Sequence, residues 1–396
     1  MKKNRFLFST LLITFLGVFL QGCSYFPIQT AAPYVKDLYR RIPYKLDGRY
    51  RVINIFYATC RDIGEGKNFS SCFLPKIGED ISYGKMDIKV DPGLKIGRMR
   101  PAALKRRGMI KMDDLEKMKT DDFISELQEA VKNSPHNSLL VLTFGYKDDF
   151  EVTAIKAAYF AYLLDVNTPV LLFDWPGNQP VSLEGYGKAR KLAEKSGPYL
   201  CNLMGKIVRE VRPQKLWLAS SSLGAQVVCS AFGSMCKSSD FADSDFEIDH
   251  VILSAPDVAE GEFDSDFKDE IASLTRFLTA YVSSDDEALL LSGIIDGERK
   301  LGRQVIKPSE SVKSHKQFEE MKNLMYLKSL QPDKISLVDV TPVNNASARH
   351  GYYLESPDYF DDFYIRILGR QPNLNRRLYL FKVKKKTDYW VLLGPR

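Results

Sequence analysis

Residues 215–232 read KLWLASSSLGAQVVCSAF, and this stretch decides the fold. The apolar run over 215–219 predicts a strand, and the small and apolar residues over 223–232 predict a buried helix. Serines and a glycine join the two, so the strand ends in a tight turn that leads directly into the helix. A continuous apolar strand of this kind is typical of a parallel sheet covered on both faces.

The same pattern extends in both directions along the chain. Further strands are predicted over 51–59, 85–90, 139–143, 170–175, 250–254, 277–282 and 335–340, and helices over 121–132, 150–164, 187–210 and 358–367. Residues 91–112, which are rich in glycine, proline and bases, are expected to form a loop. Short strands that alternate with helices indicate a doubly wound, mostly parallel α/β sheet, here of about eight strands.

Composition and charge exclude several other classes of protein. The chain has 396 residues, of which 44% are hydrophobic, and this excludes a disordered, collagen-like or coiled-coil protein. The net charge is +6, but residues 2–5 and 376–396 carry all of the excess and leave the rest of the chain mildly acidic. We therefore expect no nucleic-acid partner.

The N-terminus resembles a bacterial lipoprotein signal peptide, residues 1–22. Basic residues precede an apolar run over 6–20, which is shorter than the ~20 residues of a spanning helix. Leu-Gln-Gly then precedes Cys23, the expected lipidation site. Ser24 in place of aspartate favours the outer membrane of the bacterial cell envelope, facing the periplasm. The alternative is an uncleaved anchor with an ordinary cysteine.

Four regions follow from this reading: the signal peptide, a tether over 23–48, the main domain over 49–370 and a basic C-terminal hairpin over 371–396. The hairpin could contact anionic lipid, or be a sheet edge that lysines protect from aggregation. Residues 293–334 could form a lid or a surface excursion.

The other cysteines and the histidines give no sign of a metal site, and no cofactor is expected. Cys60 and Cys72 are close in a loop-rich stretch and could form a disulfide, which the periplasm permits. Cys229 and Cys236 lie in or near the buried helix and are expected to be small core residues.

Candidate catalytic residues follow the strands, because sites in such sheets form at the carboxyl ends. Ser222 lies in the turn after 215–219, two residues before Gly224, where a nucleophile elbow needs small neighbours. Ser220 only approximates the glycine usual two residues before the serine. The alternative is a serine-rich helix cap.

His350 is the best candidate for a general base, because it follows the strand over 335–340. His136 and His250 lie at the wrong end of the sheet, and His315 lies in the polar excursion. For the acid that would orient the imidazole, Asp286 competes with Asp285 and Asp257. The order serine, acid, histidine is that of α/β-hydrolases.

An oxyanion hole needs two backbone N–H groups. Leu223, directly after the candidate nucleophile, would supply one, and Tyr146, in the turn after the strand over 139–143, would supply the other.

A series of motifs runs over roughly residues 50–368: Phe56-Tyr57-Ala58-Thr59 with Arg61, Ser82-Tyr83-Gly84, Gly145-Tyr146 with Phe150, Phe173-Asp174-Trp175-Pro176, Ala255-Pro256-Asp257, Tyr281-Val282-Ser283, Asp286-Glu287-Ala288-Leu289, and His350 with Tyr352-Tyr353 and Ser356-Pro357. With them the chain resembles an uncharacterised bacterial family of α/β-hydrolases grouped with esterase- and lipase-like enzymes. The resemblance implies an α/β-hydrolase fold with Ser222, Asp286 and His350 as the triad.

Two positions depart from the family pattern. Phe144 and Ser221 stand where the family usually has histidines, in His-Gly-Tyr and His-Ser-Met-Gly. Two functions remain open. One is a membrane-anchored serine hydrolase acting on small-molecule or lipid carboxylic esters. The other is a catalytically weak or inactive lipoprotein that binds or scaffolds.

Overall fold

The computed structural model describes residues 42–66, 69–97, 101–242, 247–304, 333–368, 378–384 and 387–394. All of them belong to one compact unit, Arg40–Arg396. The predicted signal peptide, Cys23 and most of the predicted tether lie outside the described residues. So does the greater part of the predicted lid or excursion over 293–334.

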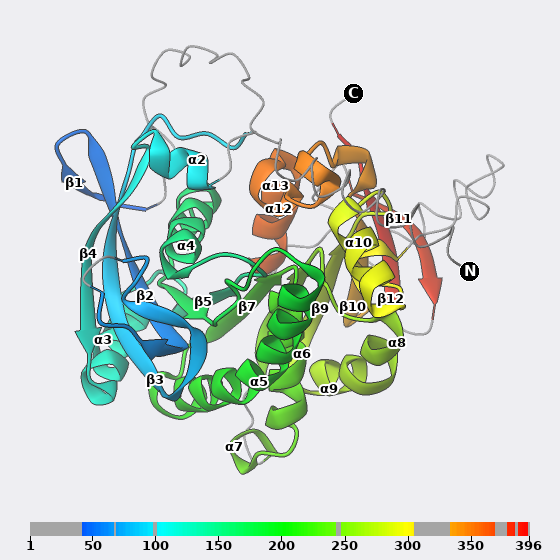
Figure 1. The fold of residues 1–396 in the computed structure, drawn as a ribbon, viewed down its shortest axis with the longest axis horizontal. Helices are drawn as coiled ribbons and strands as arrows, with labels where there is room; N and C mark the ends of the chain where they lie inside the picture. Colours follow the sequence, from blue (N-terminus) through cyan, green and yellow to red (C-terminus); the bar gives the residue numbers. More distant parts are fainter. Residues whose placement is uncertain are drawn as a thin grey trace. The chain divides into compact units, whose positions relative to one another are not determined.

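A single mixed sheet forms the centre of this unit (Figure 1). Its strand order is β11-β12-β10-β9-β8-β7-β5-β6-β2-β3-β4, and β1 pairs with β2. Eight neighbouring strands run parallel: β2 (Tyr50–Ile63), β5 (Ser138–Thr143), β6 (Val170–Asp174), β7 (Lys215–Ser221), β8 (Ile248–Ser254), β9 (Thr275–Val282), β10 (Ile335–Asp339) and β12 (Thr387–Leu392). The predicted doubly wound, mostly parallel sheet is therefore confirmed.

Antiparallel strands extend the sheet at both edges, and they make the predicted count of about eight strands too low. These strands are β1 (Lys45–Asp47), β3 (Phe73–Val90), β4 (Ile110–Met118) and β11 (Leu378–Lys384). The prediction of a loop over 91–112 was wrong, because α2 (Pro101–Arg106) and the start of β4 lie there. Most of β4 is polar and exposed or half-buried, as suits an edge strand, so its sequence lacks an apolar run.

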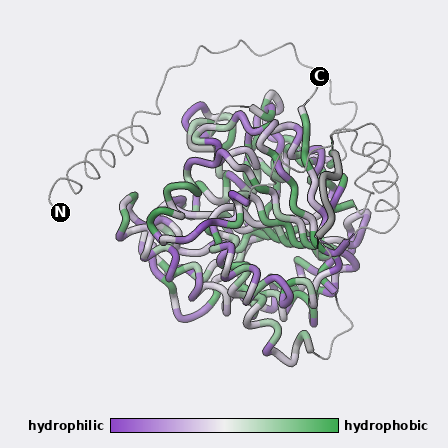
Figure 2. The backbone as a smooth tube through the Cα atoms, turned by 90° about the vertical axis from the view of Figure 1, so that its right-hand side faces the viewer, coloured by the Kyte–Doolittle hydropathy of each residue, from purple (hydrophilic) through white to green (hydrophobic). Residues whose placement is uncertain are grey.

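Helices cover both faces of the sheet. One face carries α4 (Phe150–Leu164), α12 (Tyr352–Glu355) and α13 (Pro357–Ile367), and the other carries α3 (Thr120–Lys132), α5 (Leu183–Lys206), α6 (Gly224–Met235) and α9 (Lys268–Leu274). Leu140 and Leu142 of β5 face the first core, and Leu139 and Val141 face the second. Figure 2 shows hydrophobic strands inside the fold and hydrophilic segments around them.

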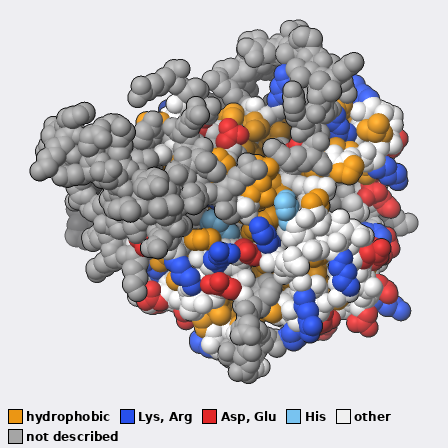
Figure 3. All heavy atoms as spheres, turned by 180° about the vertical axis from the view of Figure 1, so that it is seen from behind, with side chains coloured by type: hydrophobic (Ala, Val, Ile, Leu, Met, Phe, Trp, Pro, Cys, Tyr) orange, Lys and Arg blue, Asp and Glu red, His pale blue; other side chains and the backbone are white. Residues whose placement is uncertain are grey.

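Shorter elements complete the described fold. The short helices are α7 (Ser239–Ala242), α8 (Glu260–Glu262) and α10 (Glu287–Asp296), and single turns occur at η1 (Ile207–Val211), η2 (Phe263–Phe267), η3 (Leu301–Arg303), η5 (Thr341–Val343) and η6 (Ser347–Arg349). No helix of the described part is both long and apolar enough to span a bilayer. Figure 3 shows charges of both signs mixed over one face, with hydrophobic side chains gathered near its centre.

The order of the strands reverses between β5 and β7. From β5 the chain continues through α4 to β6 and then crosses back through α5 to β7, on the other side of β5. The two strands run side by side up to the pair Thr143 and Ser220. In open α/β sheets, ligands bind at such a switch point, outside the carboxyl ends of the strands.

The C-terminal strands continue the sheet beyond β10. Strands β11 and β12 pair antiparallel, and β12 lies parallel to β10 from the pair Ile335 and Thr387 to the pair Asp339 and Val391. The hairpin therefore contributes two strands to the main sheet, β12 beside β10 and β11 at the edge.

The cysteines differ from expectation in two respects. Cys60 and Cys72 are both free, so the possible disulfide is not formed. Cys60 lies buried on β2 with its Sγ 3.4 Å from Ser196 Oγ, whereas Cys72 Sγ contacts the Phe69 carbonyl oxygen at 3.1 Å. Cys229 is buried as expected, but Cys236 is exposed because it caps the end of α6.

Candidate active site

Ser222 occupies a strained turn between β7 and α6. Its φ of 54° lies in the left-handed region, which serine rarely adopts and which must be held by its surroundings. The Ser222 N–H donates to the Ser254 carbonyl at 2.9 Å, and its own carbonyl accepts from the Asp257 N–H at 3.1 Å. The end of β8 thus fixes the conformation that a nucleophile elbow requires.

The alternative of a serine helix cap does not fit this turn. Helix α6 begins at Gly224, its N-cap is Leu223, and no side chain caps it. Ser220 and Ser221 are buried, and their hydroxyls have no hydrogen-bond partner within the described residues.

Two glycines let the turn after β5 approach the serine closely. A Cβ added to Gly145 would lie 2.6 Å from Ser222 Cβ and 3.0 Å from its Oγ. A Cβ added to Gly224 would lie 2.7 Å from the Phe144 carbonyl oxygen. Contacts this short exclude any side chain at either position unless the backbone moves, so the glycines bring the two turns together.

The backbone N–H groups proposed for an oxyanion hole lie at these two turns. The Gly145 Cβ position is 3.1 Å from the Leu223 nitrogen, which places that N–H beside the turn containing Tyr146. Within the described residues, neither the Tyr146 N–H nor the Leu223 N–H donates to a protein acceptor. Both groups are therefore unpaired at the switch point, as donors to a developing oxyanion must be before substrate binds.

His350 and Asp286 meet at the same edge of the sheet. Nδ1 of His350 lies 2.8 Å from Oδ2 of Asp286, which is fully buried, while the His350 side chain keeps 19% of its surface exposed. Asp286 follows β9, and His350 follows β10, the neighbouring strand. No hydrogen bond joins Ser222 Oγ to the His350 ring in the described part of the chain. Such catalytic contacts often tighten only when substrate binds.

The competing carboxylates have other partners. Asp257 is buried and accepts from the Tyr186 hydroxyl at 3.1 Å and the Ser292 hydroxyl at 3.0 Å, with Lys300 Nζ 3.3 Å away. Asp285 accepts from the Ser283 hydroxyl at 2.6 Å. Of the three candidate acids, the structure brings Asp286 to the imidazole.

The charge of Asp286 controls the ionisation of His350. Burial of the ring lowers the pKa of His350, but the charge of Asp286 and their hydrogen bond outweigh burial, and Asp257 adds to them. The pKa of His350 therefore lies above its ordinary value of 6.5. The other histidine of the strands, His250, is buried within β8 with Nε2 2.8 Å from Thr279 Oγ1, away from this edge.

A buried ion pair, which was not predicted from the sequence, supports the turn after β5. Arg61 Nε lies 2.5 Å from Asp174 Oδ2, and both residues are almost fully buried. The same guanidinium donates to the Asp148 carbonyl at 3.1 Å and to Asn178. The available signal was Asp174, the only charge in the apolar strand β6, since a buried charge needs a partner.

The tryptophan after β6 completes this support. Trp175 Nε1 donates to the Phe144 carbonyl at 2.7 Å, and the Lys147 N–H donates to the Gly177 carbonyl at 2.7 Å. The turn that contains Gly145 and Tyr146 is thus held from the side of β6.

The two departures from the family pattern lie at one place. Thr143 and Ser220 are the last pair between β5 and β7; Phe144 directly follows β5, and Ser221 is the last residue of β7. Phe144 is buried, and Lys156 Nζ lies 5.7 Å from the centre of its ring. An aromatic ring and a small hydroxyl therefore replace two imidazoles beside the elbow.

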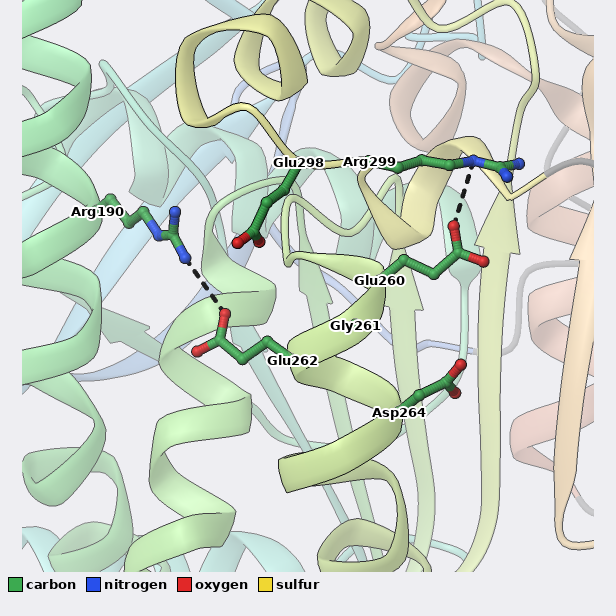
Figure 4. A pocket seen from close by; sticks show the side chains of 7 residues that line it. All are labelled: Arg190, Glu260, Gly261, Glu262, Asp264, Glu298 and Arg299. Atoms are coloured by element: carbon green, nitrogen blue, oxygen red, sulfur yellow. Dashed lines mark hydrogen bonds and ion pairs between the residues drawn. The ribbon is translucent and has the colours of Figure 1, made fainter.

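A charged cavity of about 680 Å³ lies apart from these residues (Figure 4). Its lining is Arg190, Glu260, Gly261, Glu262, Asp264, Glu298 and Arg299. Arg190 pairs with Glu262 and Arg299 with Glu260, each at 3.2 Å. In the described residues, no group of three or more histidine, cysteine or acidic side chains is arranged to hold a metal ion.

A mostly parallel sheet with helices on both faces, and a serine in a strained strand-to-helix turn at its carboxyl edge, define an α/β-hydrolase fold. Residues 118–370 match the family described as alpha/beta hydrolase of unknown function (DUF900). The chain belongs to this family, which confirms the predicted membership in an α/β-hydrolase family of unknown function. A comparison with curated proteins finds no match.

Proposed function

We propose that the protein is a serine hydrolase that cleaves carboxylic esters of small molecules or lipids. The observation that carries this proposal is the left-handed Ser222 at the switch point, with the Asp286–His350 hydrogen bond on neighbouring strands of the same edge. Non-glycine residues held in this conformation cluster at active sites and ligand-binding sites.

The reaction would proceed through an acyl-enzyme. Ser222 Oγ attacks the ester carbonyl carbon as His350 Nε2 takes its proton, and Asp286 stabilises the resulting imidazolium through Nδ1. The N–H groups of Tyr146 and Leu223 donate to the oxyanion. His350 then protonates the leaving alcohol, and the acyl group remains on Ser222. A water molecule, deprotonated by His350, attacks the acyl-enzyme carbonyl carbon. The bond from this carbon to Ser222 Oγ then breaks, His350 returns the proton to Oγ, and the carboxylic acid leaves.

An activity-based fluorophosphonate probe tests the nucleophile. We expect it to label the full chain at Ser222, labelling to disappear in Ser222→Ala, and labelling to persist in Ser221→Ala, the buried neighbour. Peptide mapping by mass spectrometry identifies the labelled residue. Absence of labelling in the unmodified protein, or labelling that survives in Ser222→Ala, would overturn the proposal.

A catalytically weak or inactive protein that binds or scaffolds is the second candidate. The observation that favours it is the pair Phe144 and Ser221, where the family usually has histidines beside the elbow. Hydrolysis of p-nitrophenyl esters by the unmodified protein, lost in Ser222→Ala, decides against it.

We also propose that the protein is anchored in the bacterial cell envelope through a lipidated Cys23, in the outer membrane facing the periplasm. The support is the sequence pattern of residues 1–23. Metabolic labelling with palmitate and fractionation of the two membranes test it. Cys23→Ala should lose the label and leave the outer-membrane fraction, and unchanged labelling would contradict the anchor.

A further inference from the structure

The loops that carry Asp286 and His350 are joined by a buried side chain outside the triad. Asn344 lies between η5 and η6, in the loop after β10, and is 1% exposed. Its Nδ2 donates to the Ser283 hydroxyl oxygen at 2.8 Å, across to the loop after β9. Ser283 in turn donates to Asp285 Oδ1 at 2.6 Å, directly before Asp286.

The same amide also holds the backbone that precedes His350. Asn344 Nδ2 donates to the Arg349 carbonyl at 2.5 Å, and Asn344 Oδ1 accepts from the Ala346 N–H at 3.3 Å. The Arg349 guanidinium reaches back to the Asn344 carbonyl. The Asn344 side chain therefore joins the beginning of the loop after β10 to its end, next to His350.

This closure restrains an unusual backbone. Ala348 and Arg349 both have φ near 50°, two adjacent non-glycine residues in the left-handed region, immediately before His350. Such a conformation persists only when the surroundings of the residue enforce it. The bond from Asn344 to the Arg349 carbonyl is one enforcing contact, and it acts one residue from the imidazole.

We propose that Asn344 is a positioning residue: it clamps the loop after β9 to the loop after β10 and so sets the contact between Asp286 and His350. The effect of Asn344 on catalysis rests on the proposed function. Its effect on the position of His350 does not, and it can be measured separately. An amide suits this place because it offers two donors to Ser283 and Arg349 while it accepts from Ala346.

The groups around His350 make the joining of the two loops by Asn344, the clamp, measurable through the pKa of the imidazole. The charged and titratable groups facing the ring are Asp286 after β9, Asp257 after β8 and Lys156 on α4, and the Tyr353 ring of α12 lies 6.2 Å away. Asp286 alone among them bonds to the ring. If the two loops separate, the ring loses its closest carboxylate but stays largely buried, so its pKa must fall.

Titration of the histidines by NMR tests the clamp in the full chain. The chain has four histidines, and His350→Gln assigns the signal of His350. We expect the His350 titration to shift to lower pH in Asn344→Ala and to stay unchanged in Asn345→Ala, the exposed neighbour. Ester hydrolysis should fall about 100-fold in kcat in Asn344→Ala, with KM little changed, as for a misplaced catalytic group.

A second variant keeps the test decisive if Asn344→Ala does not fold. Ser283→Ala removes the hydroxyl that accepts from Asn344 on the loop after β9, together with the bond from Ser283 to Asp285. The bond of Asn344 to Arg349 and its longer contact with Asp285 Oδ1 at 3.4 Å remain, so the His350 titration should shift in the same direction but by less. An unchanged titration in folded Asn344→Ala or Ser283→Ala overturns the clamp. If the unmodified protein neither reacts with the fluorophosphonate nor cleaves esters, the proposed function fails, while the titration still decides the clamp.

Discussion

Asp286 holds His350 and a helix with the same carboxylate. Its Oδ2 lies 2.8 Å from His350 Nδ1, and its Oδ1 accepts from the Leu289 N–H at 2.9 Å as the N-cap of α10. The orientation of the imidazole is therefore tied to the start of a helix, which leaves the carboxylate little freedom to rotate.

This arrangement predicts the pH dependence of hydrolysis. His350 acts as a base only when neutral, so kcat/KM, which reports the free protein, should rise with pH and reach half its maximum above pH 6.5. Asp286→Asn still caps α10, but the ring loses its carboxylate while burial remains, so the midpoint should move to lower pH. The wrong tautomer should also lower kcat by about 10⁴-fold. Rate profiles of both proteins check this, with Glu287→Gln, at the exposed residue after Asp286, as the control. An unmoved midpoint in Asp286→Asn excludes Asp286 as the partner.

Gly145 should be required for activity because of its distance from the serine. In Gly145→Ala the new Cβ meets Ser222 Cβ at 2.6 Å, so the turn must shift and the Tyr146 N–H moves with it. We expect the loss of at least one oxyanion donor, about 10²–10³ in kcat. Gly187→Ala in α5, where nothing lies within 4 Å, is the control. It should leave kcat unchanged and stabilise the fold by about 0.5–1 kcal/mol. Equal kcat values in the two variants would contradict the close approach.

The buried pair of Arg61 and Asp174 should matter for stability. Asp174→Leu leaves an uncompensated buried guanidinium and should lower the free energy of unfolding by about 3–5 kcal/mol. The double variant Arg61→Leu with Asp174→Leu should recover part of this loss, because no unpaired charge remains. Chemical denaturation measures both. Lys76→Ala breaks the exposed pair with Asp62 and should cost less than about 1 kcal/mol. Equal effects of the buried and exposed changes would refute the argument.

His250 should make the fold sensitive to acid. Burial lowers the pKa of His250 to about 3, so below about pH 6.5 the unfolded chain binds a proton that the folded chain does not. Its contribution to stability is complete above pH 6.5 and is lost as the pH falls toward 3, by about 1.4 kcal/mol per pH unit. In His250→Gln this part of the slope should vanish from unfolding measured between pH 6 and 4, whereas the exposed His136→Gln should keep it. A slope unchanged by His250→Gln would show that other groups cause it.

The parallel strands could be predicted because the apolar side chains that cause their burial are visible in the sequence. Strands β5, β6, β7 and β8 are apolar without alternation, and helix α4 was predicted with its observed bounds, 150–164. The edge strand β4 was missed, since IKMDDLEKM mixes charges with apolar residues, and its structure depends on pairing with β3. Pairing between distant segments leaves no local signal.

The candidate site likewise has residues that could be predicted from the sequence and contacts that could not. Ser222 and His350 could be chosen from the ends of strands, because the carboxyl edge of a sheet is implied by its topology. The clamp by Asn344 could not be chosen, because its partners Ser283 and Arg349 lie on two loops whose contact depends on the neighbouring register of β9 and β10. Single hydrogen bonds between loops do not follow from strand order.

The parallel pairing of β12 with β10 has a consequence for the biosynthesis of the protein. The strand that leads to His350 has β9 on one side and β12 on the other, and residues 387–392 leave the ribosome well after residues 335–339. Until they do, β10 presents an unpaired edge, which is prone to join the strands of other chains. The strand that leads to His350 thus obtains its second neighbour only late in synthesis. A chaperone that covers this edge would protect the nascent chain until then.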